Sequence, residues 1–174
     1  MNQAYQNMRS FWLDATNFQT RKGLLEIGAN RIVAAGIEMV IPDGTLLKHV
    51  WVATNSLGDS SLSFENNSKS GLGGMIGGHD NEPLQQAAAR MLAYAGKLSN
   101  QMRELPSSAA MPSPTRSGQI GIWAISKEKY FYTEFAEEEL RNPQHPFYPL
   151  FAYSQQMIGL FKTQPNSQNP PARA

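Results

Sequence analysis

The stretch PLQQAAARMLAYAGKLSNQMREL, residues 83–105, carries the strongest periodic pattern in the chain. Its apolar residues recur at alternating spacings of four and three, as on one face of an amphipathic helix. These residues are Leu84, Ala88, Met91, Ala95, Leu98, Met102 and Leu105. Asp80 or Asn81 can cap the start, and Pro83 suits the first turn. Pro106 ends the pattern, so we predict one long helix over residues 83–105.

Two strand pairs flank this helix in the sequence. Residues 45–65 alternate on both sides of a turn at residues 55–59, which predicts a hairpin whose first strand is apolar on both faces. Residues 119–135 repeat the arrangement around a turn at residues 127–129. The two pairs share a faint likeness around their tryptophans, which chance similarity between buried strands explains better than an internal repeat.

Three further segments have helical spacing. They are an N-terminal stretch with Tyr5, Met8, Trp12 and Ala15 at three- and four-residue intervals, residues 24–39, and residues 147–162. The predicted order is therefore α-α-ββ-α-ββ-α. This order indicates an α+β fold, in which an antiparallel sheet of about four strands is covered by helices mainly on one face. We expect one domain over residues 1–162 and a disordered, polar, Pro-rich tail over residues 163–174.

Two segments beside the long helix lack a regular pattern. Residues 71–78, GLGGMIGG, contain too many glycines for a helix and too few side chains for a stable strand, so we predict a loop. Residues 106–118 are rich in Pro and Ser, which is typical of a mobile linker.

The composition excludes several classes of protein. The 174 residues carry a net charge of +1, which indicates neither a nucleic-acid partner nor an anionic membrane. No stretch approaches the length of a membrane span, and the N-terminal residues do not resemble a signal peptide. The chain has no cysteine, which excludes disulfides, thiolate metal sites and a cysteine nucleophile. We therefore expect a cytoplasmic protein.

The glycine-rich segment precedes a helix N-terminus, a place where phosphates bind in other proteins. It lacks the Gly-Lys-Ser/Thr ending of a phosphate-binding loop, and the carboxylates of Asp80 and Glu82 would repel an anion there. His79, Asp80 and Glu82 have no second histidine at metal-ligand spacing, so they are better explained as a solvated cap. The sequence therefore predicts no catalytic residue, no metal site and no cofactor.

The aromatic residues support two alternative hypotheses. In the first, the chain is a non-catalytic binding protein that forms a homodimer. Self-association would use an uncovered apolar face of the sheet or the N-terminal helix. The candidate interface residues are Tyr5, Met8, Phe11 and Trp12.

In the second hypothesis, the chain binds a small apolar or aromatic molecule, with or without catalysis. The pocket would lie between the sheet and helix 83–105 and would be gated by the glycine-rich loop 71–78. The candidate ligand-binding residues are His49, Trp51, His79, Asp80, Trp123 and Tyr132.

Overall fold

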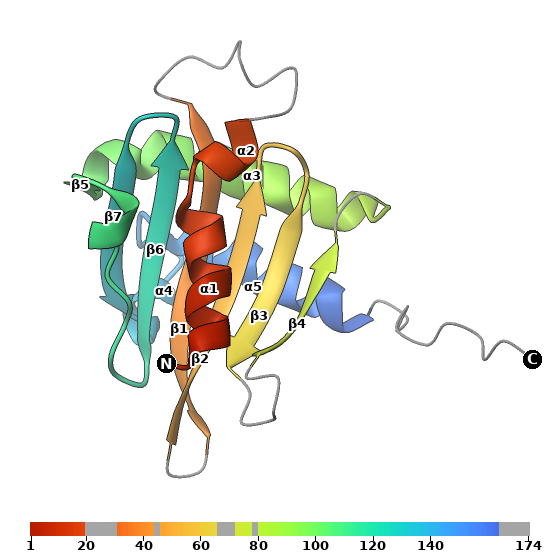
Figure 1. Cartoon of the computed structure of the whole chain (residues 1–174), viewed down its shortest axis with the longest axis vertical. Coiled ribbons are helices and arrows are strands. Elements are labelled where there is room, and N and C mark those ends of the chain that lie inside the picture. Colours follow the sequence, from red (N-terminus) through yellow and green to blue (C-terminus); the bar gives the residue numbers. More distant parts are fainter. Residues whose placement is uncertain (20–30, 44–45, 66–71, 78–79, 164–174) are drawn as a thin grey trace, which may run out of the picture.

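The computed structural model describes residues 1–19, 31–43, 46–65, 72–77 and 80–163. These residues form an α+β fold on one antiparallel sheet of seven strands, in the order β4-β3-β2-β1-β6-β7-β5 (Figure 1). The strands are β1 (Ile32–Asp43), β2 (Leu46–Asn55), β3 (Ser60–Glu65), β4 (Leu72–Gly77), β5 (Arg103–Leu105), β6 (Gln119–Ser126) and β7 (Tyr130–Ala136). The helices are α1 (Gln3–Leu13), α2 (Thr16–Gln19), α3 (Glu82–Leu98), α4 (Glu137–Leu140) and α5 (Tyr148–Thr163), with 3₁₀ turns at Ser99–Gln101 and Ser108–Ala110.

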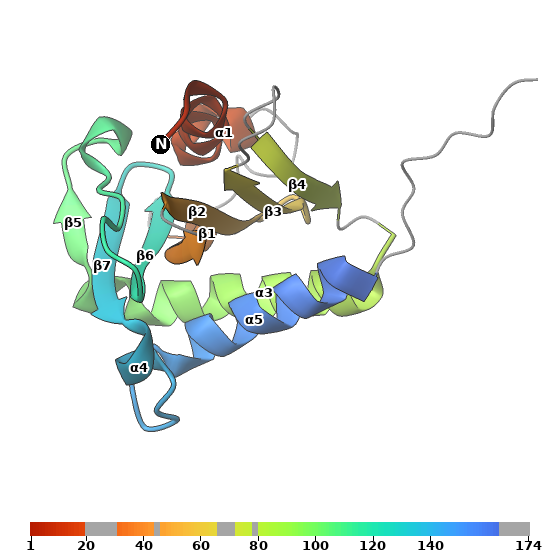
Figure 2. The same ribbon diagram turned by 90° about the horizontal axis from the view of Figure 1, so that it is seen from below.

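The sheet is covered on both faces. Helices α3 and α5 pack side by side on one face, and α1 lies across the other (Figure 2). Each covered face has its own apolar core, one beneath α3 and α5 and one beneath α1. The expectation that helices cover mainly one face is therefore correct for the two long helices, while α1 closes the opposite side.

Both predicted hairpins are present. β2 pairs with β3 around the turn at residues 55–59, and β6 pairs with β7 around residues 127–129. The predicted final helix corresponds to α5, and the predicted N-terminal helix corresponds to α1. Residues 164–174, which make up nearly all of the predicted disordered tail, lie outside the described residues.

The prediction of a helix over residues 24–39 is wrong where the structure describes that segment. Residues Ile32–Asp43 form β1, the central strand, which pairs with β2 on one side and β6 on the other. Because β1 is covered on both faces, apolar residues occupy consecutive positions instead of alternating with polar ones. Such a run satisfies helical spacing as well as strand spacing, and only the partner strands resolve the ambiguity.

The long helix is shorter than predicted. α3 ends at Leu98, and the chain then forms a 3₁₀ turn and the short strand β5. Met102 and Leu105 are both buried, although neither belongs to the helix. Met102 lies in the same core as the α3 residues, whereas Leu105 lies in the core on the opposite face of the sheet. The start agrees with the prediction, because the Asn81 side chain accepts a hydrogen bond from the backbone N–H of Leu84 at 3.0 Å.

The glycine-rich segment is a strand instead of a loop where it is described. Residues Leu72–Gly77 form β4, which pairs residue by residue with β3. A Cβ atom at Gly73 would come within 2.3 Å of the Phe64 ring, so a side chain there would displace that ring. A partner strand that supplies hydrogen bonds thus offsets the low intrinsic strand preference of glycine.

Candidate functional site

The sheet face beneath α1 gathers most of the aromatic residues that the sequence singled out. Trp51 on β2, Trp123 on β6 and Tyr132 on β7 are buried in one apolar cluster. Tyr5 and Trp12 of α1 are buried in the same cluster. Predicted ligand-binding residues and predicted interface residues therefore pack together within one chain. α1 covers this face, so it is not the uncovered sheet face suggested for a second copy, and it is not the α3 side on which the ligand pocket was expected.

The other two residues of the predicted interface lie at the margin of this cluster. Met8 is partly buried against it, whereas the Phe11 side chain is 53% exposed. Of the four candidates, Phe11 is thus the one that presents a large apolar surface to solvent.

Two tryptophans form the floor of this face. The rings of Trp51 and Trp123 stack with centroids 4.7 Å apart and planes 21° apart. Their strands are separated by β1, and they meet over Gly36, where a Cβ atom would lie 2.4 Å from the Trp123 ring. Neither indole N–H has a hydrogen-bond partner among the described residues. The two tryptophan rings are therefore held in place by stacking and close packing.

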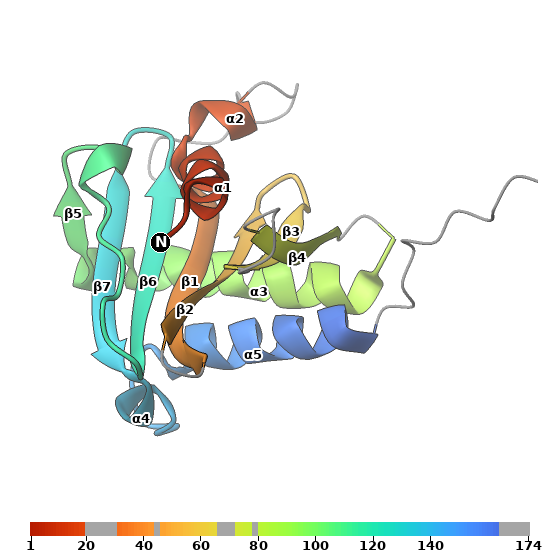
Figure 3. The same cartoon turned by 60° about the horizontal axis from the view of Figure 1, so that its bottom comes forward.

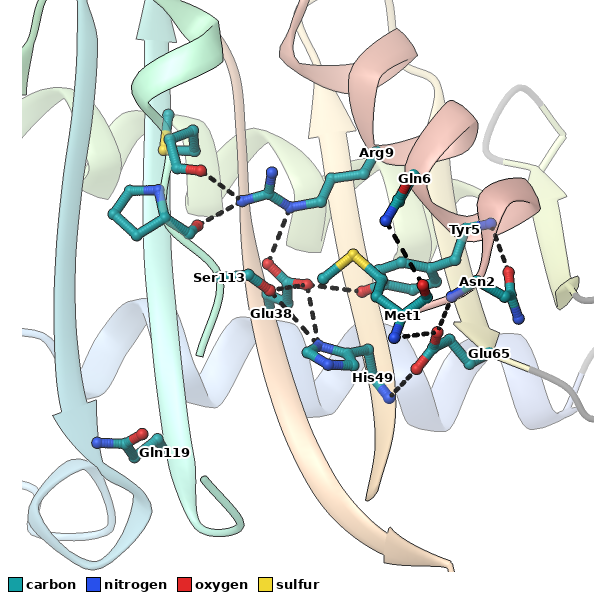
Figure 4. A network of polar contacts seen from close by, with 12 residues as sticks. Met1, Asn2, Tyr5, Gln6, Arg9, Glu38, His49, Glu65, Ser113 and Gln119 are labelled. Carbon is teal, nitrogen blue, oxygen red and sulfur yellow. Dashed lines mark hydrogen bonds and ion pairs between the residues drawn. The ribbon is translucent and has the colours of Figure 1, made fainter. Parts of the chain in front are cut away.

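The carboxylate of Glu38 on β1 lies on the same face and is 1% exposed. From α1, Tyr5 Oη donates a hydrogen bond to Glu38 Oε1 at 3.1 Å and Arg9 Nε donates one to Oε2 at 3.1 Å. Ser113 Oγ donates to Oε1 at 2.7 Å, and His49 Nδ1 lies 3.3 Å from that oxygen (Figure 4). We call these five residues the Glu38 cluster.

Arg9 extends the Glu38 cluster into the segment that was predicted to be a mobile linker. Its Nη2 donates hydrogen bonds to the carbonyl oxygens of Met111, at 3.1 Å, and Pro112. Its guanidinium carbon also lies 5.6 Å from the centre of the Trp51 ring, within cation–π range. Met111 and Pro114 are buried, so residues 111–114 pack against the sheet instead of forming a free linker, while most of residues 106–110 and 115–118 are exposed.

A second carboxylate, that of Glu65, binds the chain at the beginning of α1. Glu65, the last residue of β3, accepts hydrogen bonds from the backbone N–H groups of Asn2 at 2.5 Å and His49 at 3.3 Å. The Asn2 side chain caps α1 by accepting from the backbone N–H of Tyr5 at 2.9 Å. The orientation of α1 on the sheet is thus set at two points, Glu65 and Glu38.

Burial and hydrogen bonding change the acidities of the groups on this face. Burial by itself would raise the pKa of the Glu38 carboxyl, but His49, Arg9 and Ser113 together hold that pKa below its usual value. Burial, reinforced by the neighbouring Glu38 carboxylate, raises the pKa of the Tyr5 hydroxyl well above its usual value. Glu38 is therefore ionised and Tyr5 remains a donor at neutral pH. Because its four neighbours already engage this carboxylate, Glu38 is not a free base and acts to hold α1 on the sheet.

This arrangement predicts a loss of stability in acid. The folded-state pKa of Glu38 lies below its unfolded value of about 4.3, so the unfolded chain binds the proton more readily. The contribution of Glu38 to the free energy of unfolding is complete above the pKa of its carboxyl in the unfolded chain. It is lost as the pH falls through the lower pKa of the folded state. We expect urea denaturation between about pH 7 and about pH 3 to show this decline. A Glu38→Gln variant should show a shallower decline, and equal declines would contradict the assignment.

Of the remaining candidate residues, Asp80 is exposed at the turn before α3 and is not part of this site, and His79 lies outside the described residues. The sequence interpretation missed Glu38, Arg9 and Ser113. One signal was available, because Glu38 is the only charged residue in the run Ile32–Ile41, and a charged residue in a buried strand needs a partner.

A cleft of about 450 Å³ lies between α3 and one end of the sheet. Its position agrees with the expected pocket between the sheet and the long helix, but its lining does not. It contains none of the described candidate residues His49, Trp51, Asp80, Trp123 and Tyr132.

Within the residues that the structure describes, no three His, Asp or Glu side chains come together in a way that could hold a metal ion. No helix in those ranges is long and apolar enough to cross a membrane.

Comparison with known proteins adds no family to these observations. No family model matches the chain, and no curated protein is significantly similar to it.

Proposed function

We propose that this chain is a non-catalytic binding protein that self-associates by pairing the edge strand β4 with β4 of a second copy. The observation that supports the proposal is that this edge of the sheet is uncharged and exposed. β4 is the outermost strand of the sheet (Figures 1 and 3) and contains no charged residue. Its residue Ile76 is 80% exposed.

An exposed strand edge offers unpaired N–H and C=O groups to any extended chain, and most proteins protect such edges with charges, proline or short strands. The opposite edge of this sheet is protected in that way. β5 has only three residues, and the side chains of Arg103 and Glu104 on it are exposed. β4 has twice that length and no such protection, and within the described residues no strand pairs with its outer side.

A second copy fits this edge for two reasons. The uncharged β4 strands of two copies would meet without like-charge repulsion. An antiparallel β4 pair would also obey two-fold symmetry and join the two sheets into one. The faces of the sheet are less suitable, because α1 covers one and α3 and α5 cover the other.

The proposal predicts that Ile76→Lys weakens self-association at least about tenfold, or ~1.4 kcal/mol, because it places a charge at the pairing edge. The measurement is sedimentation equilibrium of wild type and variant over a wide range of concentration. Since Ile76 is so exposed, the substitution should leave the stability of the monomer within about 0.5 kcal/mol of wild type.

Phe11→Lys is the matched control, because it removes an exposed apolar residue from α1 and leaves β4 intact. It should associate as strongly as wild type. If Phe11→Lys dissociates the dimer and Ile76→Lys does not, the N-terminal helix is the interface. If the wild-type chain stays monomeric at the highest concentration, self-association itself is refuted.

A further inference from the structure

The cleft beside α3 is independent of the Glu38 cluster and of the β4 edge. The residues that line it come from α3, the start of β1 and the turn between β2 and β3. Figure 1 shows α3 crossing that end of the sheet. Its volume of about 450 Å³ is within the roughly 300–1,000 Å³ typical of small-molecule sites. It is lined by Arg31, Ile32, Asn55, Ser56, Gly58, Gln85, Ala88, Ala89, Leu92, Ala93 and Gly96.

One wall of the cleft is apolar and built from small side chains. α3 contributes three alanines, Leu92 and Gly96, and Ile32 faces them from the start of β1. A Cβ atom at Gly96 would lie 3.9 Å from Ile32 Cγ1, an ordinary contact distance. The space beside Gly96 is therefore open and suited to methylene groups.

The polar part of the cleft favours an anion. Among the described residues that line the cleft, Arg31 is the only charged one; it is exposed and makes no ion pair with a described residue. The hydroxyl of Ser56 in the same lining is buried and has no hydrogen-bond partner among the described residues. A guanidinium that makes no ion pair with a described residue is suited to bind a carboxylate through two parallel hydrogen bonds.

From the Arg31 guanidinium beside an apolar wall, we propose that this cleft binds a small aliphatic carboxylate. The carboxylate pairs with Arg31, and the hydrocarbon chain lies along Ala89, Leu92 and Gly96. Each methylene that leaves water should strengthen binding about fourfold until the wall is covered. This site does not depend on self-association, so Ile76→Lys should leave it unchanged.

The test is calorimetric titration of the whole chain with butanoate, hexanoate and octanoate, each kept below its micellar concentration. We expect saturable binding of one molecule per chain, with affinity rising along the series. Hexylamine, which has the same chain and the opposite charge, should bind at least about tenfold more weakly than hexanoate. Absence of saturable octanoate binding, or equal binding of hexylamine and hexanoate, overturns the proposal.

Two variants locate the site. Arg31→Gln should weaken hexanoate binding at least about tenfold. Gly96→Leu should abolish binding of the whole series by filling the space along α3. The control is Gly159→Leu, which makes the same change on α5, where a Cβ atom has no neighbour within 4 Å. Unchanged hexanoate binding by Arg31→Gln, or by folded Gly96→Leu, overturns the assignment. The assignment is also overturned if folded Gly159→Leu loses as much hexanoate binding as Gly96→Leu.

Discussion

Replacing Glu38 with glutamine should lower the free energy of unfolding by about 3–5 kcal/mol at neutral pH. The variant keeps the shape of the side chain but removes the charge that Arg9 Nε meets at 3.1 Å. Arg9 is then left largely buried without an opposing charge, and an unpaired buried charge is far more costly than a lost surface pair. Urea denaturation at neutral pH measures the effect.

Glu104→Gln is the matched control, because it removes a carboxylate from an exposed ion pair. Glu104 lies 2.9 Å from Lys129 Nζ, and both side chains are about half exposed, so the loss should stay below about 1 kcal/mol. A loss of similar size in the two variants would show that the Glu38 cluster does not hold α1 to the sheet. Replacing Arg9 with methionine and Glu38 with leucine together should restore much of the stability, because neither charge then remains unpaired.

Gly36→Ala should destabilise the chain by about 3 kcal/mol, at the upper end of the range for overpacked cores. The new Cβ atom would lie 2.3 Å from the backbone oxygen of Val52 and 2.4 Å from the ring of Trp123. The backbone oxygen belongs to the neighbouring strand β2, so that contact is relieved only if β1 shifts. The contact with the Trp123 ring is relieved only if the stacked tryptophans move. Denaturation gives the magnitude, and near-ultraviolet circular dichroism reports on the stacked pair Trp51 and Trp123.

Gly159→Ala provides the comparison for Gly36→Ala. Gly159 lies within α5, and a Cβ atom there meets nothing within 4 Å. Alanine has the higher helix propensity, so this variant should be neutral or more stable by up to about 1 kcal/mol. If Gly36→Ala proved equally neutral with an unchanged tryptophan signal, the close approach of Trp123 to Gly36 would be wrong.

Only part of the Glu38 cluster was named from the sequence. Tyr5 was selected as an interface residue and His49 as a ligand-binding residue, in two separate hypotheses. The aromatic residues at positions 5, 12, 51, 123 and 132 were divided between the same two hypotheses, and the structure brings them into one cluster. What covers them was not predictable. Arg9 and Ser113 reach Glu38 across 29 and 75 positions of the chain, and no local pattern records contacts at such separations.

The sequence by itself determined the elements whose signals are local. These are the hairpins with turns at residues 55–59 and 127–129, the capped start of α3 at Asn81, and the helix over Tyr148–Thr163. Turn, capping and period signals depend on residues a few positions apart, so they can be recognised before the chain folds.

Only the tertiary structure decided the elements that depend on a partner. β1 is a strand because β2 and β6 pair with it, although its apolar run also satisfies helical spacing. β4 is a strand because β3 supplies hydrogen bonds to a segment rich in glycine. The stretch 83–105 combines both cases. Its apolar positions as far as Met102 are buried in the core beneath α3, as their spacing requires. The last of them, Leu105, is buried on the opposite face of the sheet from β5, which forms because β7 lies beside it.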